Sequence, residues 1–127
     1  MSALYELQIA LNAMLGSDFY FDAAPREAAY PYRVGSFSPS FDDEVAEVFY
    51  LELDYWDTGK TTERIYSMAE ADAGNGDTAA PTGLNRAKIQ LESGYAVLCK
   101  DKTVPLTDED AKKRRVRISY TVRLYYE

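Results

Sequence analysis

The chain has 127 residues, of which 46% are hydrophobic, and a formal net charge of −7 at pH 7. It contains one cysteine and no histidine, which excludes an internal disulfide framework and removes the commonest metal ligand and neutral-pH acid–base group. An acidic chain is also a poor candidate for a free-standing nucleic-acid-binding protein, because phosphate contacts require basic side chains. We expect a single soluble domain over residues 1–127, made in a reducing cytosol, with no signal peptide and no membrane span.

The N-terminal segment predicts a helix followed by a short edge strand. Ser2 can cap the helix, and Gly16 is a typical C-terminal stop. Between them, apolar side chains recur at three- and four-residue spacing, which is typical of one buried helix face. This stripe consists of Leu4, Leu7, Leu11, Met14 and Leu15. Residues 19–21 predict the short strand, and residues 22–29 a loop.

A strand and a charged arm follow. Residues 30–36 predict the strand, with Pro31 marking a sheet edge or a strand start, because proline lacks the N–H that a ladder needs. Residues 37–44 predict a turn or projecting arm that begins at Phe37. The arm ends in an acidic cluster formed by Asp42, Asp43 and Glu44.

Residues 45–56 predict a long strand, because apolar and polar side chains alternate with a period of two. We expect one face to be buried and the other to meet solvent. The expected buried face consists of Phe49, Leu51, Leu53 and Tyr55, and the other face of Tyr50, Glu52, Asp54 and Trp56. Residues 57–59 end this strand.

The next segment predicts a second, weakly apolar helix. Thr61 or Thr62 can cap it, and Glu63 is favourable in its first turn. Its short apolar face consists of Ile65, Met68 and Ala69, with Asp72 as a further candidate. The Gly-Asn-Gly-Asp run at residues 74–77 stops the helix.

The C-terminal third predicts two more long strands. Residues 84–91 form the first, with a bulge or bend at residues 93–94 before the alternation resumes through Cys99. Residues 100–113 are interpreted as a long charged connection with a turn at Pro105.

Residues 114–127 predict a terminal strand that pairs with residues 45–56. Its buried face consists of Val116, Ile118, Tyr120, Val122, Leu124 and Tyr126. On the other face, Arg117 and Arg123 can pair across strands with Glu52 and Asp54. The elements together predict an α+β fold, a mainly antiparallel sheet of about four strands with two helices packed on one face.

No segment carries a convincing catalytic, metal or cofactor signature. The Gly-Lys-Thr-Thr run at residues 59–62 lacks the first glycine of a phosphate-binding loop, since Asp54 stands there, and is interpreted as a turn into a helix cap. The acidic cluster, with Glu47, does not follow the spacing of a calcium loop. Cys99 has no histidine to serve as a base. We therefore expect a protein that is not an enzyme and that needs no cofactor.

The order of the elements resembles the tail terminator (tail completion) proteins of long-tailed bacteriophages, along the whole chain. The resemblance rests on the helix through Leu15, the Tyr-Pro-Tyr strand start at 30–32 and the run 51–57 leading to Thr61 and Thr62. It also rests on the terminal strand, which starts Arg-Arg-Val-Arg at 114–117 and ends Leu-Tyr-Tyr at 124–126. The weak second helix and the small polar tail at 71–80 depart from the family pattern.

The resemblance implies a ring, usually a hexamer, that caps the growing tail tube, stops its polymerisation and joins the tail to the head connector. The implied partners are further copies of the chain, the major tail tube protein and a head connector or neck protein. DNA would pass through the ring without specific binding, aided by an acidic lumen. The implied location is the virion tail near the head–tail junction, after assembly in the host cytoplasm.

A ring needs two different matching patches on each subunit. We expect these patches to consist of aromatic side chains on the outer face of the sheet and of the charged arms. The interface candidates are Phe37, Asp42, Asp43, Glu44, Tyr50, Trp56, Arg114, Arg115 and Tyr125. Three alternatives stay open. They are a head–tail connector or minor neck protein, a small binding domain that uses its sheet as a platform, and an enzyme that uses Glu52 and Asp54.

Overall fold

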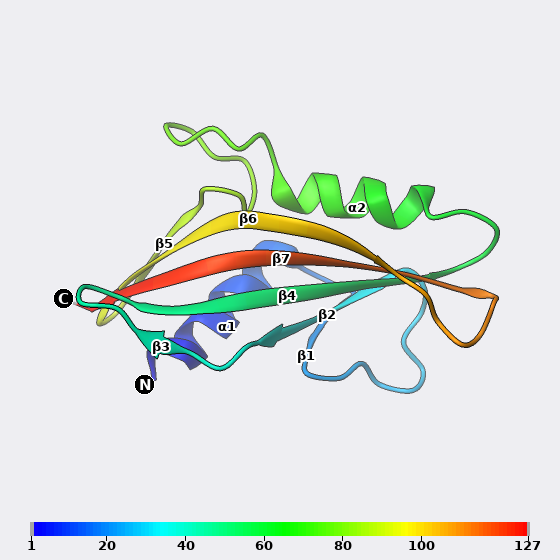
Figure 1. The fold of residues 1–127 in the computed structure, drawn as a ribbon, viewed down its shortest axis with the longest axis horizontal. Coiled ribbons are helices and arrows are strands. Elements are labelled where there is room, and N and C mark those ends of the chain that lie inside the picture. Colours follow the sequence, from blue (N-terminus) through cyan, green and yellow to red (C-terminus); the bar gives the residue numbers. More distant parts are fainter. Residues whose placement is uncertain (1, 127) are drawn as a thin grey trace.

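The computed structural model describes residues 2–126, which form two helices and a seven-stranded sheet (Figure 1). In chain order the elements are α1 (Ala3–Leu15), β1 (Phe19–Phe21), β2 (Tyr32–Phe37), β3 (Phe41–Asp42), β4 (Glu47–Thr58), α2 (Glu63–Ala73), β5 (Lys88–Leu91), β6 (Gly94–Leu106) and β7 (Lys113–Tyr126). The strand order is β1-β2-β4-β7-β6-β5, and β3 also pairs with β4.

The prediction of a mainly antiparallel sheet of about four strands was wrong. The sheet has seven strands instead of about four, and it is mixed, because β1 and β2 run parallel while the other pairs are antiparallel. It curls strongly into a half-barrel (Figure 1). Strand twist and the β-bulge between Lys100 and Lys102 in β6 favour such curling.

The two central strands confirm the predicted pairing of the long alternating runs. β4 and β7 are antiparallel neighbours from Glu47 opposite Leu124 to Thr58 opposite Lys113. The inward-facing residues of β4 are buried as predicted, and so are those of β7 up to Leu124. Tyr126, predicted to continue the buried stripe, is 60% exposed and lies at the end of the strand.

The predicted connection at residues 100–113 was also wrong, because most of it is strand. β6 continues to Leu106, and Pro105 lies inside it, opposite Val116 of β7. β5 covers β6 only from Gly94 to Val97, so the later part of β6 lies at a sheet edge, where proline is tolerated. The result is a long β6–β7 hairpin that runs along the molecule and has its turn at one end (Figure 1).

The strand predicted at residues 84–91 is reduced to the four residues of β5. The backbone N–H of Leu84 donates to the carbonyl of Asp72, and Arg86 has a positive φ of 67°, so this segment turns before the strand begins. The predicted bend at residues 93–94 is the tight turn that joins β5 to β6, in which Leu91 pairs with Gly94.

The predicted arm at residues 37–44 partly joins the sheet. Phe37 is the last residue of β2, and β3 pairs with the start of β4. Between the two short strands, the Ser38 N–H donates to the Tyr50 carbonyl at 2.9 Å and the Ser38 hydroxyl accepts from the Tyr50 N–H at 2.8 Å. β2 and β3 therefore border the same edge of β4.

The two helices pack on one face of the sheet. α1 confirms the predicted capping, with the Ser2 hydroxyl accepting from the Tyr5 N–H at 3.3 Å and Gly16 following with a φ of 72°. Thr62 precedes α2, but its side chain makes no cap hydrogen bond. Ala3, Leu7 and Leu11 of α1 and Ile65 and Ala69 of α2 belong to one core cluster with the sheet. Neither described helix has the length and apolar character that crossing a membrane requires.

Candidate interaction surface

The outer face of the sheet carries a compact ion-pair network at its centre. Arg117 of β7 donates from Nε to Asp54 Oδ1 at 2.7 Å, and its Nη1 lies 3.1 Å from Glu52 Oε2. Arg115 donates to Asp54 Oδ2 at 2.6 Å. The predicted pairing of Arg117 with both carboxylates is confirmed, whereas Arg123 contacts Asp43 instead, at 3.4 Å. Glu52 and Asp54 thus have arginine partners across the strand.

The two arginine neighbours of Asp54 lower the pKa of its carboxyl group. Its side chain is 15% exposed, and this burial raises its pKa, but hydrogen bonds from Arg117 and Arg115 together outweigh the burial. The net pKa of Asp54 therefore lies below its usual value. The carboxylate form is favoured, which suits a structural ion pair.

We expect Asp54→Asn to lower the free energy of unfolding by about 1–2 kcal/mol at pH 7, because two charged hydrogen bonds are weakened. The folded-state pKa is depressed, so this stabilisation is complete above the unfolded-state pKa of about 4 and is lost as pH falls through the folded-state pKa. Urea unfolding of both proteins from pH 7 to pH 2.5 should show the difference shrinking towards acid. Asp101→Asn, at an exposed position, is the control, and a difference that persists at the lowest pH would contradict the assignment.

Three of the predicted interface aromatics already pack within the chain. Trp56 stacks on Tyr32, with ring centroids 6.4 Å apart, and the Arg115 guanidinium lies 4.5 Å from its ring centroid. At the other end of β7, Tyr125 stacks on Tyr95 at 4.9 Å. Phe37 points into the core, 5.1 Å from the Phe49 ring centroid, because its place in β2 is opposite the buried Leu51.

The remaining predicted residues occupy exposed positions. Tyr50 is 45% exposed on the outer face. The acidic residues Asp42, Asp43 and Glu44 are exposed at the β3–β4 turn. Arg114 and Arg115 were both predicted as interface residues, but neighbouring residues of a strand point to opposite faces. Arg114 donates to the carbonyls of Ala111 and Lys113, while Arg115 joins the network of the outer face.

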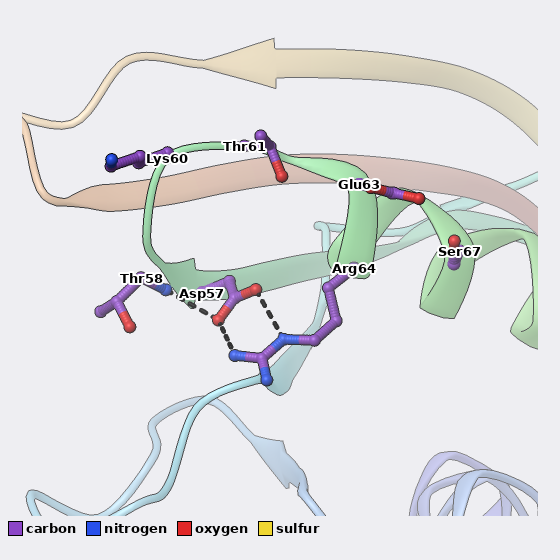
Figure 2. A pocket seen from close by; sticks show the side chains of 7 residues that line it. All are labelled: Asp57, Thr58, Lys60, Thr61, Glu63, Arg64 and Ser67. Atoms are coloured by element: carbon purple, nitrogen blue, oxygen red, sulfur yellow. Dashed lines mark hydrogen bonds and ion pairs between the residues drawn. The ribbon is translucent and has the colours of Figure 1, made fainter.

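A pocket of about 430 Å³ lies beside the end of β4 and the first turn of α2 (Figure 2). Asp57, 2% exposed, accepts from Arg64 Nε at 2.9 Å and from the Thr58 N–H at 2.8 Å. The hydrogen bond from Arg64 holds the pKa of Asp57 below its usual value. Lys60 and Thr61 lie away from this pair in Figure 2. A buried carboxylate in the lining is unfavourable for phosphate, so the segment remains a turn into a helix.

A buried charged centre was missed by the sequence analysis. Arg33 is 5% exposed and faces inward from β2, where its guanidinium binds both carboxylate oxygens of Asp72 in α2 at 2.8 and 2.9 Å. It also donates to the carbonyls of Leu15, the last residue of α1, and of Ser17 just beyond it, and the Tyr55 hydroxyl donates to Asp72 at 2.7 Å. This centre ties both helices to the sheet. A charged residue on the apolar face of the second helix was the available signal.

Two tyrosines beside this charged centre have raised pKa values. Burial, aided by the negative charge of Asp72, raises the pKa of Tyr55 well above its usual value and also raises that of Tyr120. The Tyr120 hydroxyl is buried and has no hydrogen-bond partner within the described part of the chain. Residues 2–126 contain no cluster of three or more histidine, cysteine or acidic side chains that could hold a metal ion.

Comparison with known proteins gave a structural match without a sequence match. No protein-family model matches the chain, and no curated protein does. Among solved structures, the chain is similar to one in the virion of the native gene transfer agent particle, with a TM-score of 0.62 and 18% sequence identity. The match covers 96% of this chain and 90% of the other. The two chains therefore share a fold over nearly their whole length.

Proposed function

We propose that this chain is a structural protein of a phage-like virion, and within that class a tail terminator that forms a ring on the end of the tail tube. The observation that carries the proposal is the full-length fold match to a chain of a gene transfer agent virion. The whole-chain resemblance of the element order to tail terminators supports the finer assignment.

The surface properties are compatible with assembly. The molecule is elongated (Figure 1), and both apolar and acidic side chains are exposed at the β3–β4 turn. A ring built from one kind of subunit uses heterologous contacts, in which two different patches match, and the two ends of the sheet differ in residue type. The net charge of −7 would let DNA slide through such a ring without adhering.

The decisive experiment mixes the purified chain with polymerising tail tube protein of the same particle and images the product by electron microscopy. A terminator is expected to give tubes of limited length that end in a ring. Tubes of unrestricted length without rings, beside a chain that binds the isolated head connector, would favour the alternative of a connector or neck protein. Binding to neither would contradict a role at the head–tail junction.

A further inference from the structure

The two ends of the sheet carry complementary surfaces. At one end, the β3–β4 turn forms what we call the acidic tip, which consists of Phe41, Asp42, Asp43, Glu44 and Val45. At the other end, the loop after β4 and the turn of the β6–β7 hairpin, with the first residues of β7, line what we call the basic cleft, formed by Thr58, Gly59, Lys60, Ala111, Lys112 and Arg114. Figure 1 shows the β3–β4 turn and the turn of the β6–β7 hairpin at opposite ends of the long axis.

The acidic tip combines exposed apolar area with negative charge. Phe41 is 64% and Val45 70% exposed, which is unusual for large apolar side chains that are close together. Asp43 contacts Arg123 at 3.4 Å, with both side chains 46% exposed. Asp42 and Glu44 have no ion-pair partner within residues 2–126. The tip therefore offers unneutralised carboxylates next to an exposed aromatic ring.

The basic cleft has the opposite character. Its volume is about 470 Å³, within the range of roughly 300–1,000 Å³ typical of pockets that enclose a small ligand. Its only charged lining residues are Lys60, Lys112 and Arg114, and none of them forms an ion pair within the described chain. The acidic residues 108–110 belong to the same hairpin turn and are not among the lining residues, although Asp110 Oδ1 accepts from the Lys112 N–H at 2.9 Å. Alkyl stems of lysine and arginine provide apolar contact area below the charges.

The two surfaces cannot meet within one molecule. They lie beyond opposite ends of β4, whose 12 residues span roughly 40 Å. A contact between them must therefore join different copies of the chain. Such a contact is head-to-tail, and repeating it produces either a closed ring or an open filament.

We propose that the acidic tip of one copy docks into the basic cleft of the next copy. Phe41 and Val45 enter the cleft against the lysine and arginine stems, while the carboxylates of the tip face its three cations. The charge pattern sets the direction of the contact, because tip against tip and cleft against cleft both place like charges together. The inference rests on the proposed ring and names the surfaces that build it.

The test uses charge reversal at each end of the full chain. One variant carries Asp42→Lys, Asp43→Lys and Glu44→Lys. A second carries Lys60→Glu, Lys112→Glu and Arg114→Glu. A third combines all six changes and so exchanges the charges of the two ends. A matched control carries Glu27→Lys, Glu70→Lys and Asp101→Lys, at exposed positions outside both surfaces. Circular dichroism verifies that each variant is folded.

Assembly is measured by sedimentation velocity and by electron microscopy, alone and with tail tubes. We expect each single-end variant to need about a tenfold or higher protein concentration for half of the chains to assemble. The variant that carries all six changes is expected to assemble again, and the control to behave as wild type. End variants that assemble as well as wild type would overturn the docking and leave the ring proposal standing. The docking proposal would also be overturned if the variant with all six changes is folded but does not assemble. A wild-type chain that stays monomeric, even on tube ends, would overturn both.

Discussion

Replacement of Arg33 by methionine is expected to lower the free energy of unfolding by about 3–5 kcal/mol, because it removes one partner of a buried ion pair. Asp72 would keep only the Tyr55 hydroxyl, and the carbonyls of Leu15 and Ser17 would lose their donor. Chemical unfolding followed by circular dichroism measures the change. The loss is a large fraction of the 5–15 kcal/mol typical of a folded domain.

The matched control is Arg123→Met, which removes an exposed arginine from its 3.4 Å contact with Asp43. Exposed ion pairs contribute about 0–1 kcal/mol, so this change should be nearly neutral. The double variant Arg33→Met with Asp72→Leu should recover part of the loss, since no unpaired charge is left inside. Equal effects of Arg33→Met and Arg123→Met would show that the buried centre does not stabilise the fold.

Gly94→Ala is expected to cost about 3 kcal/mol for a steric reason. A Cβ at this position would lie 1.9 Å from the Tyr125 carbonyl oxygen and 2.9 Å from its carbon, both of which are backbone atoms of β7. The end of β7 or the β5–β6 turn must therefore move. Thermal unfolding should show a lower midpoint, and amide hydrogen exchange should show faster exchange near Tyr125.

Gly16→Ala separates this steric effect from the general cost of replacing glycine. Gly16 has a φ of +72°, and nothing lies within 4 Å of an added Cβ, so the cost is limited to about 1 kcal/mol of backbone strain. The predicted order is therefore a larger loss at Gly94 than at Gly16. The reverse order would contradict the close approach of β6 and β7 at their paired ends.

The parts of the fold with a strong local pattern were predictable. α1 combines an apolar stripe with residues suited to both caps, and β4 and β7 alternate over more than ten residues each. The second half of β6 has no such signal. Its Lys-Asp-Lys run and Pro105 are typical of a loop, and only pairing with the distant β7 makes it a strand. The short strands β1 and β3 likewise depend on their neighbours in the sheet.

The side-chain contacts also divide into those that a local sequence pattern predicts and those that depend on tertiary packing. The partnership of Arg117 with Glu52 and Asp54 followed from the alternation of two strands, because paired strands place same-face residues together. Arg33 and Asp72 are 39 residues apart in the sequence, and their contact depends on how α2 packs on the sheet. The division of Arg114 and Arg115 between two faces follows from strand geometry once β7 is known to begin at Lys113.

The stacked position of Trp56 has a spectroscopic consequence. It is the only tryptophan of the chain, and it lies two residues before Thr58 of the basic cleft, between the Tyr32 ring and the Arg115 guanidinium. Intrinsic fluorescence excited near the red edge of the protein absorption band therefore comes from one known place. The molecule carries an unlabelled optical probe at one end, whose emission reports the surroundings of that end in the free chain and in any assembly it joins.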